Sequence, residues 1–157
     1  MKTSDFIKKL DIRFDVYALK REWRKLQKNV NIQDRQISLS HTPDCPEDER
    51  WHQGNGGLFW DHKNPGLKNT EKSFSIINTQ LEDSYLHYVC NIMKKKFNIG
   101  RIRFMVMEPE YTYPVHHDFE RRWHLAIEAP RDSFMYFRLN DNYVFDYIDP
   151  PAVMEKK

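Results

Sequence analysis

The sequence has few cysteines, no long apolar run and almost no net charge, and each of these features excludes a class of protein. Cys45 and Cys90 are the two cysteines of the 157-residue chain, and they stand in unlike contexts without the short spacing of a zinc site. We therefore expect two free thiols in a reducing compartment.

No stretch of the sequence is apolar for the length that crosses a membrane, and its first residues lack the apolar run of a signal peptide. The net charge is +2, from 25 basic and 23 acidic residues, so charge alone gives no reason to expect a nucleic-acid-binding protein. The sequence also has no internal repeats and no low-complexity tracts. We expect a soluble cytoplasmic protein with neither nucleic acid nor membrane as a partner.

Aromatic residues, in contrast, are abundant. They make up 14% of the chain, which favours packed sheets over disorder. A chain of 157 residues is long enough for one substantial core and too short for two. A single domain over residues 1–157 is therefore predicted.

Residues 10–41 are predicted to form a strand, a helix and a second strand. Leu10, Ile12 and Phe14 alternate with charged residues, which is the pattern of a half-buried strand. Asp15 can then cap a helix whose opposite face is charged, as a solvated surface usually is. The apolar residues of this helix recur at steps of three and four: Val16, Leu19, Trp23, Leu26 and Val30. A short strand follows at 35–41.

Periodicity disappears between residues 42 and 70, where prolines and glycines accompany Trp51, His52 and Trp60. A loop of this length inside a compact domain is usually functional or disordered. Its aromatic and histidine side chains favour a binding role, so these three residues are the candidate substrate contacts of a lid. The equally weighted alternative is that Trp51, Phe59 and Trp60 pin the loop onto the core.

Helical spacing returns over 81–97, and Asn98-Ile99-Gly100 supplies a stop signal. The three lysines near the end of this helix suit its dipole and need no nucleic acid to explain them. Each later segment has the pattern of a strand: 101–107, 113–118, 122–128, 133–139 and 143–148. This order predicts an α+β fold, mainly β, of the jelly-roll or β-sandwich kind with the helices on one side.

The candidate site lies in these strands. Residues two apart in a strand share a face, so His116 and Asp118 point the same way, as do Arg122 and His124. A His-x-Asp pair is two-thirds of the facial triad that holds non-haem Fe(II), and a guanidinium suits a dicarboxylate co-substrate. The plainer alternatives are an exposed turn for His116 and Asp118, a surface ion pair for Arg122 and a core position for His124.

The sequence resembles the aspartyl/asparaginyl β-hydroxylase-type branch of the Fe(II)/2-oxoglutarate dioxygenases. The resemblance rests on three motifs in order: G-R-x-R-x-M with a following proline over 100–109, H-x-D at 116–118, and R-x-H at 122–124 before an apolar strand. Weaker similarity reaches back through 37–41, the loop at 54–59 and the helix at 81–97, and so covers most of the chain.

The resemblance implies a double-stranded β-helix, or cupin-like fold, and O₂-dependent hydroxylation coupled to oxidation of 2-oxoglutarate to succinate and CO₂. His116 and Asp118 would be the Fe(II) ligands and catalytic centre. Arg122 and His124 would hold the 2-oxoglutarate or shape its pocket. The substrate would be an amino-acid or peptidyl side chain or another small molecule.

One departure from the family pattern concerns the third metal ligand. The family has a distal histidine and then an arginine, whereas His124 is the last histidine here and Arg138 is the last arginine. Three interpretations follow. The chain is a dioxygenase lacking its C-terminal strands, so that the double-stranded β-helix is incomplete. Alternatively, a partner chain supplies the third ligand, or one of three other histidines does: His41, His62 or His117. The last interpretation is a catalytically inactive binding or assembly module derived from such an enzyme.

Overall fold

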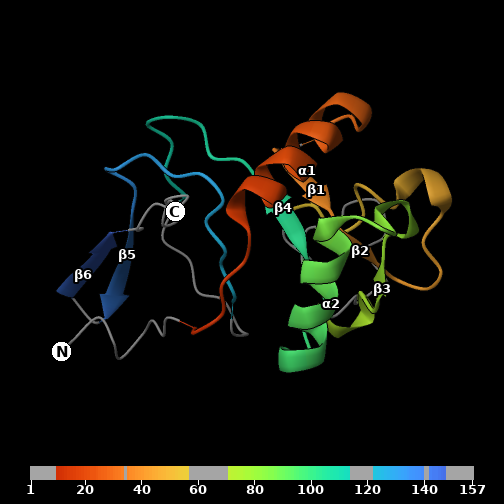
Figure 1. Ribbon diagram of the computed structural model, residues 1–157. Helices are drawn as coiled ribbons and strands as arrows, with labels where there is room; N and C mark the ends of the chain where they lie inside the picture. Colours follow the sequence, from red (N-terminus) through yellow and green to blue (C-terminus); the bar gives the residue numbers. More distant parts are fainter. Residues whose placement is uncertain (1–9, 34, 57–70, 114–121, 140–141, 148–157) are drawn as a thin grey trace. The chain divides into compact units, whose positions relative to one another are not determined.

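The computed structural model describes residues 10–33, 35–56, 71–113, 122–139 and 142–147 (Figure 1). It divides the chain into two compact units. The central unit is Arg21–Thr112, and the terminal unit combines Met1–Lys20 with Tyr113–Lys157. This division does not test the prediction of a single domain.

Helix α1 spans Val16–Asn29, in agreement with the predicted helix, and the boundary between the units falls within it. Asp15 caps it as expected, because its Oδ1 accepts a hydrogen bond of 2.9 Å from the backbone N–H of Ala18. Leu19 and Leu26 of the predicted apolar face are buried. The opposite face carries the charged residues, as an amphipathic surface helix requires.

The segment before α1 differs from the prediction, since the structure has no strand at 10–14. The burial still alternates: Leu10, Ile12 and Phe14 are half-buried, and Asp11 and Arg13 are exposed. A strand also needs a neighbour to accept its backbone hydrogen bonds. Within the described residues, this segment has no strand partner.

The central unit contains two short antiparallel pairs of strands. The first joins β1 (Gln36–Ser38) to β4 (Arg103–Met105), with Ile37 opposite Phe104. The second joins β2 (Ser40–His41) to β3 (Ile76–Ile77). The predicted strand at 35–41 is therefore interrupted at a single residue.

That residue, Leu39, connects the two pairs. Its N–H donates to the carbonyl of Ile102 at 2.8 Å, and its carbonyl accepts from the N–H of Asn78 at 3.0 Å. The two hydrogen bonds are made to segments next to β4 and β3, so the chain changes partner here. Ser40 Oγ then accepts from the N–H of Ile102 at 2.8 Å. The N–H of Ile102 thus binds a side chain, and β4 is shorter than the predicted 101–107.

Helix α2 covers Tyr85–Phe97, within the predicted 81–97. It begins late because Ser84 is its N-cap, with Oγ accepting from the N–H of His87 at 3.1 Å. Asn98 ends it in the left-handed conformation, at φ 50°. The described residues of the unit also include the 3₁₀ turns η2 (Glu47–Glu49), η4 (Glu71–Ser73) and η5 (Thr79–Leu81).

The apolar core of the central unit is built from β1, β4, both helices and the connecting segments. Trp23 of α1 packs against Phe104 of β4, with the ring centroids 5.0 Å apart. Phe74 and Ile37 are fully buried. The other apolar residues that are buried in the described part of this unit are Leu26, Leu39, Cys45, Leu81, Leu86, Val89, Cys90 and Phe104.

In the terminal unit, β5 (Phe134–Leu139) and β6 (Asn142–Tyr147) form an antiparallel hairpin at the predicted positions. The predicted strand at 122–128 is not formed. Residues 122–126 are irregular, and Arg122, Trp123, His124 and Leu125 are all exposed. A strand is stabilised by burying one of its two faces, and here neither face is buried.

Among the described residues, the named strands make three separate two-stranded pairs. The double-stranded β-helix stays a prediction. None of the helices in the described part of the chain is long and apolar enough to cross a membrane.

Candidate functional site

The residues predicted to bind the metal and the co-substrate lie in the terminal unit. His116 and Asp118 lie outside the described residues. Arg122 and His124 are described, and both are exposed on the irregular segment at 122–126. The strand parity that was expected to bring these two side chains to one face therefore does not apply to them.

The described part of the chain contains no cluster of three His, Cys, Asp or Glu side chains able to hold a metal ion. A closed iron centre needs three such ligands. The described residues by themselves therefore do not fit Fe(II), and the predicted ligands His116 and Asp118 lie beyond them.

His41, one of the candidates for the third ligand, is a core residue of the central unit with 3% of its surface exposed. Its Nδ1 lies 2.8 Å from the carbonyl oxygen of Thr42. Because a carbonyl can only accept, Nδ1 carries a proton and donates it. The Nε2 atom is buried without a hydrogen-bond partner among the described residues. The other two candidates, His62 and His117, lie outside the described residues.

The predicted substrate residues Trp51 and His52 belong to the central unit, and Trp60 lies outside the described residues. Trp51 is half-buried, and its indole N–H donates to Oε1 of Gln80 at 2.7 Å. Its carbonyl accepts from the N–H of Ser38 in β1 at 2.8 Å. These contacts hold Trp51 in the way expected of a pinned loop. The neighbouring His52 has a buried Nδ1 atom without a partner in the described part of the chain.

The two arginines of the G-R-x-R motif lie at the edge of the central unit and bind protein groups. Arg101 donates from Nε to Oε2 of Glu71 at 2.9 Å and from Nη2 to Oε1 at 2.7 Å. Its Nη1 donates to the carbonyls of Gly54 at 2.6 Å and Gly56 at 2.9 Å. The side chain of Arg101 is only 2% exposed. This arginine therefore joins three segments that are distant in the sequence.

Arg103 strengthens the same junction. Its Nη1 donates to Oε1 of Gln36 at 2.6 Å and to the carbonyl of Gly56 at 2.9 Å. Gln36 Oε1 also accepts from the N–H of Gly56 at 3.1 Å. The motif thus fixes the turn at 54–56 against β1 and β4, which is a structural role.

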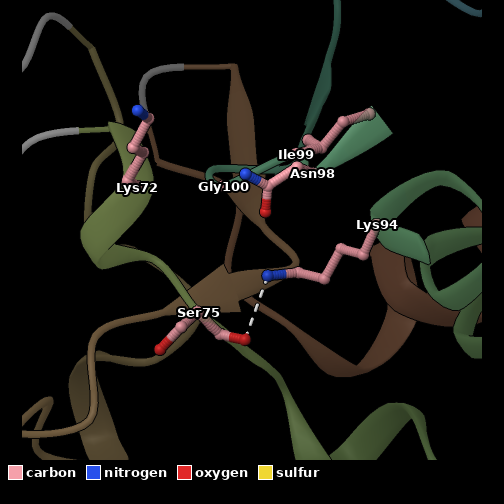
Figure 2. A pocket seen from close by; sticks show the side chains of 6 residues that line it. All are labelled: Lys72, Ser75, Lys94, Asn98, Ile99 and Gly100. Atoms are coloured by element: carbon pink, nitrogen blue, oxygen red, sulfur yellow. Dashed lines mark hydrogen bonds between the residues drawn. The ribbon is translucent and has the colours of Figure 1, made fainter. Parts of the chain in front are cut away.

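A pocket of about 260 Å³ lies between the end of α2 and the segment at 72–75 (Figure 2). We call it the lysine pocket, and its lining residues are Lys72, Ser75, Lys94, Asn98, Ile99 and Gly100. Lys94 Nζ donates to the carbonyls of Phe74 at 2.9 Å and Ser75 at 3.0 Å. Burial lowers the pKa of Lys94 from its usual value. Sequence reasoning missed this pocket, because it assigned the lysines of α2 to the helix dipole alone.

Comparison with protein-family models, with curated proteins and with solved structures finds no match to this chain. The resemblance to the β-hydroxylase branch therefore rests on the motifs in the sequence.

Proposed function

We propose that the chain is an Fe(II)- and 2-oxoglutarate-dependent hydroxylase of the cytoplasm. The observation that carries the proposal is the order His116-x-Asp118 and then Arg122-x-His124, after a G-R-x-R motif. The substrate is an amino-acid or peptidyl side chain or another small molecule.

In this proposal His116 and Asp118 hold the metal, which activates O₂ when it is bound. Arg122 and His124 provide the cationic and hydrogen-bonding groups that a dicarboxylate co-substrate needs. The exposure of both side chains is compatible with an entering ligand. Of the three candidate substrate residues, His52 and Trp60 keep that role in the proposal, because the indole N–H of Trp51 is bound by Gln80.

The experiment measures succinate formed from 2-oxoglutarate with Fe(II) and O₂. The wild-type chain forms succinate, and His116→Ala and Asp118→Ala abolish it. His87→Gln is the matched control, because this histidine lies on α2 outside the motif, and its activity equals that of the wild type. A wild-type chain that neither binds Mn(II) in calorimetry nor forms succinate refutes the proposal.

The second candidate is a binding or assembly module derived from such an enzyme. Trp123 and Leu125 favour it, because these apolar side chains are 38% and 46% exposed on the same irregular segment. Exposed apolar groups that lie together are typical of interaction surfaces. A wild-type chain that shows no metal binding and no turnover is the outcome that selects this module.

A further inference from the structure

The lysine pocket of the central unit has the features of an anion site. Two lysines line it, and none of its lining residues is acidic. Within the part of the chain that the structure describes, no carboxylate forms an ion pair with Lys72 or Lys94. The Lys94 ammonium lies at the pocket, whereas Figure 2 shows the Lys72 side chain lining the rim with its ammonium pointing away from Lys94. In the described part of the chain, no carboxylate compensates the charge of Lys94.

The ammonium group of Lys94 is held in place and still has a donor to offer. An ammonium has three N–H donors, and the carbonyls of Phe74 and Ser75 accept two of them. Figure 2 shows Lys94 reaching from α2 to the Ser75 carbonyl, with the carboxamide of Asn98 on the same side of the pocket. The third N–H of Lys94 and the amide of Asn98 are the polar groups available to a ligand.

The walls of the pocket are fixed by contacts outside it. Arg101 binds the carboxylate of Glu71, which directly precedes Lys72. Gly100 lies so close to the backbone of Glu71 that there is no room for a Cβ atom. Lys94 ties α2 to the segment at 74–75. A pocket whose walls are held in place in this way loses little entropy when a ligand enters.

The volume limits the ligand. Pockets for drug-sized molecules start at about 300 Å³, so a pocket of about 260 Å³ suits something smaller. Lysine ammonium groups bind phosphate and carboxylate as point charges. We propose that the lysine pocket binds a small oxyanion, a phosphate or carboxylate group, at the ammonium of Lys94, with Lys72 at the rim adding a weaker attraction. The residues of this site differ from those of the His116 motif, and the proposed binding does not require a metal at that motif.

The test is a titration followed by ¹H–¹⁵N NMR, on the full chain without metal or 2-oxoglutarate. Inorganic phosphate and succinate are the two probes, and chloride keeps the ionic strength constant. We expect saturable shifts in the amide signals of Ser75, Asn98, Ile99 and Gly100. Saturation with phosphate alone assigns the site to phosphate groups, and saturation with succinate alone assigns it to carboxylates.

Three variants show which lysine contributes most to the affinity for the anion. Lys72 is exposed, so Lys72→Gln weakens binding roughly threefold, in keeping with a solvent-screened contact. Lys94→Met removes a charged donor from the pocket and weakens binding roughly tenfold or more. Lys95→Gln is the matched control on the next residue of α2, outside the lining, and changes the affinity less than about twofold.

Two outcomes overturn the proposal. One is the absence of a saturable shift with either probe, which leaves Lys94 as a structural tie between α2 and 74–75. The other is an equal loss of affinity in Lys95→Gln and Lys72→Gln, which shows general attraction to a basic surface. Should Lys94→Met fail to fold, the comparison of Lys72→Gln with Lys95→Gln still decides.

Discussion

Arg101 and Glu71 form an ion pair with two hydrogen bonds, of 2.9 and 2.7 Å, across 30 residues of sequence. The Arg101 side chain is 2% exposed and that of Glu71 is 18% exposed. The planar guanidinium matches the geometry of the carboxylate. The Nη1 atom of Arg101, which does not bind Glu71, donates to the carbonyls of Gly54 and Gly56 in the turn at 54–56. This pair holds η4, the turn and the segment before β4 together.

Replacing Glu71 by Gln therefore destabilises the protein strongly. The substitution leaves the buried Arg101 guanidinium without its negative partner, and breaking such a pair costs about 3–5 kcal/mol. Urea unfolding followed by circular dichroism measures the change. Lys25→Gln is the control, because it breaks an exposed ion pair with Glu22 and costs less than about 1 kcal/mol. Equal losses in the two variants contradict a buried role for Arg101.

Arg101→Lys separates charge from geometry. A lysine keeps the positive charge but cannot make the two parallel bonds to Glu71 or reach the turn at the same time. We expect Arg101→Lys to have a lower free energy of unfolding than the wild type in the same urea experiment, although the positive charge is kept. A lysine variant as stable as the wild type contradicts the importance of the planar fork.

Gly100→Ala is expected to be destabilising for a steric reason. A Cβ atom at Gly100 collides with the backbone carbonyl of Glu71 and approaches Lys72 Cα within 3.0 Å. Overpacking of this kind costs about 1–3 kcal/mol or more, because backbone atoms have to move. The free energy of unfolding of the purified variant measures this cost.

Gly56→Ala is the informative comparison for Gly100→Ala. A Cβ at Gly56 meets nothing within 4 Å, but the residue has φ +74°, which disfavours alanine by about 1–2 kcal/mol. The two glycines thus differ in the source of the cost. A Gly100→Ala variant less destabilised than Gly56→Ala contradicts the close approach of Gly100 to Glu71.

The helices could be predicted from the sequence because their signals are local. Asp15 and Ser84 act as N-caps, and Asn98 ends α2 next to the predicted stop at 98–100. Each signal lies within a few residues of the feature it determines. The ion pair between Arg101 and Glu71 could not be predicted from local signals, because the two residues are far apart in the sequence and no periodic pattern connects them.

The strands were harder to predict than the helices, because a strand depends on a partner elsewhere in the chain. Alternation at 10–14 and 122–128 indicates a possible inner face, but pairing depends on a neighbouring backbone that the pattern does not specify. Segment 35–41 does find neighbours, and it divides at Leu39 because two different segments bind the two sides of this residue. The same dependence affects the predicted site. Arg122 and His124 were expected on one face only because residues 122–128 were predicted to be a strand, and residues 122–126 are irregular.

The two thiols are expected to be unreactive in the folded protein. Burial raises the pKa of Cys90 to about 12, and burial followed by repulsion from Glu49 raises that of Cys45 to about 11. Near pH 8 both are protonated, so alkylation by iodoacetamide is slow and accelerates on unfolding in urea. Mass spectrometry locates the label. Rapid labelling of Cys90 in the folded chain contradicts its burial.

The same thiols give an alkaline stability dependence with a defined sign. Above its ordinary pKa of 9.0, the unfolded Cys90 loses its proton while the folded thiol keeps it until about 12. Its stabilising contribution is thus complete below pH 9 and is lost as the pH rises through this window. Lys94 acts in the opposite direction, because its pKa is lowered in the fold. Cys90→Ala should therefore remove the contribution of Cys90 to the slope in urea unfolding between about pH 8 and about pH 10, while the contribution of Cys45 remains.

The hydrogen bond between Trp51 and Gln80 distinguishes a loop pinned to the core from a substrate lid. The indole N–H donates to Gln80 Oε1 at 2.7 Å, and neutral hydrogen bonds contribute about 0.5–1.5 kcal/mol. A double-mutant cycle of Trp51→Phe and Gln80→Ala measures the coupling, and we expect about 0.5 kcal/mol because the bond is exposed. The free energies come from urea unfolding of the four proteins.

The value of this coupling bears directly on function. A positive coupling means that Trp51 is held by the central unit, so Trp51→Phe lowers stability and leaves the rate of succinate formation nearly unchanged. A coupling of zero means that the bond to Gln80 does not stabilise the position of the indole, which can then turn to a substrate. In that case Trp51→Phe changes the KM for the substrate without changing the free energy of unfolding, and the lid interpretation of the loop is the correct one.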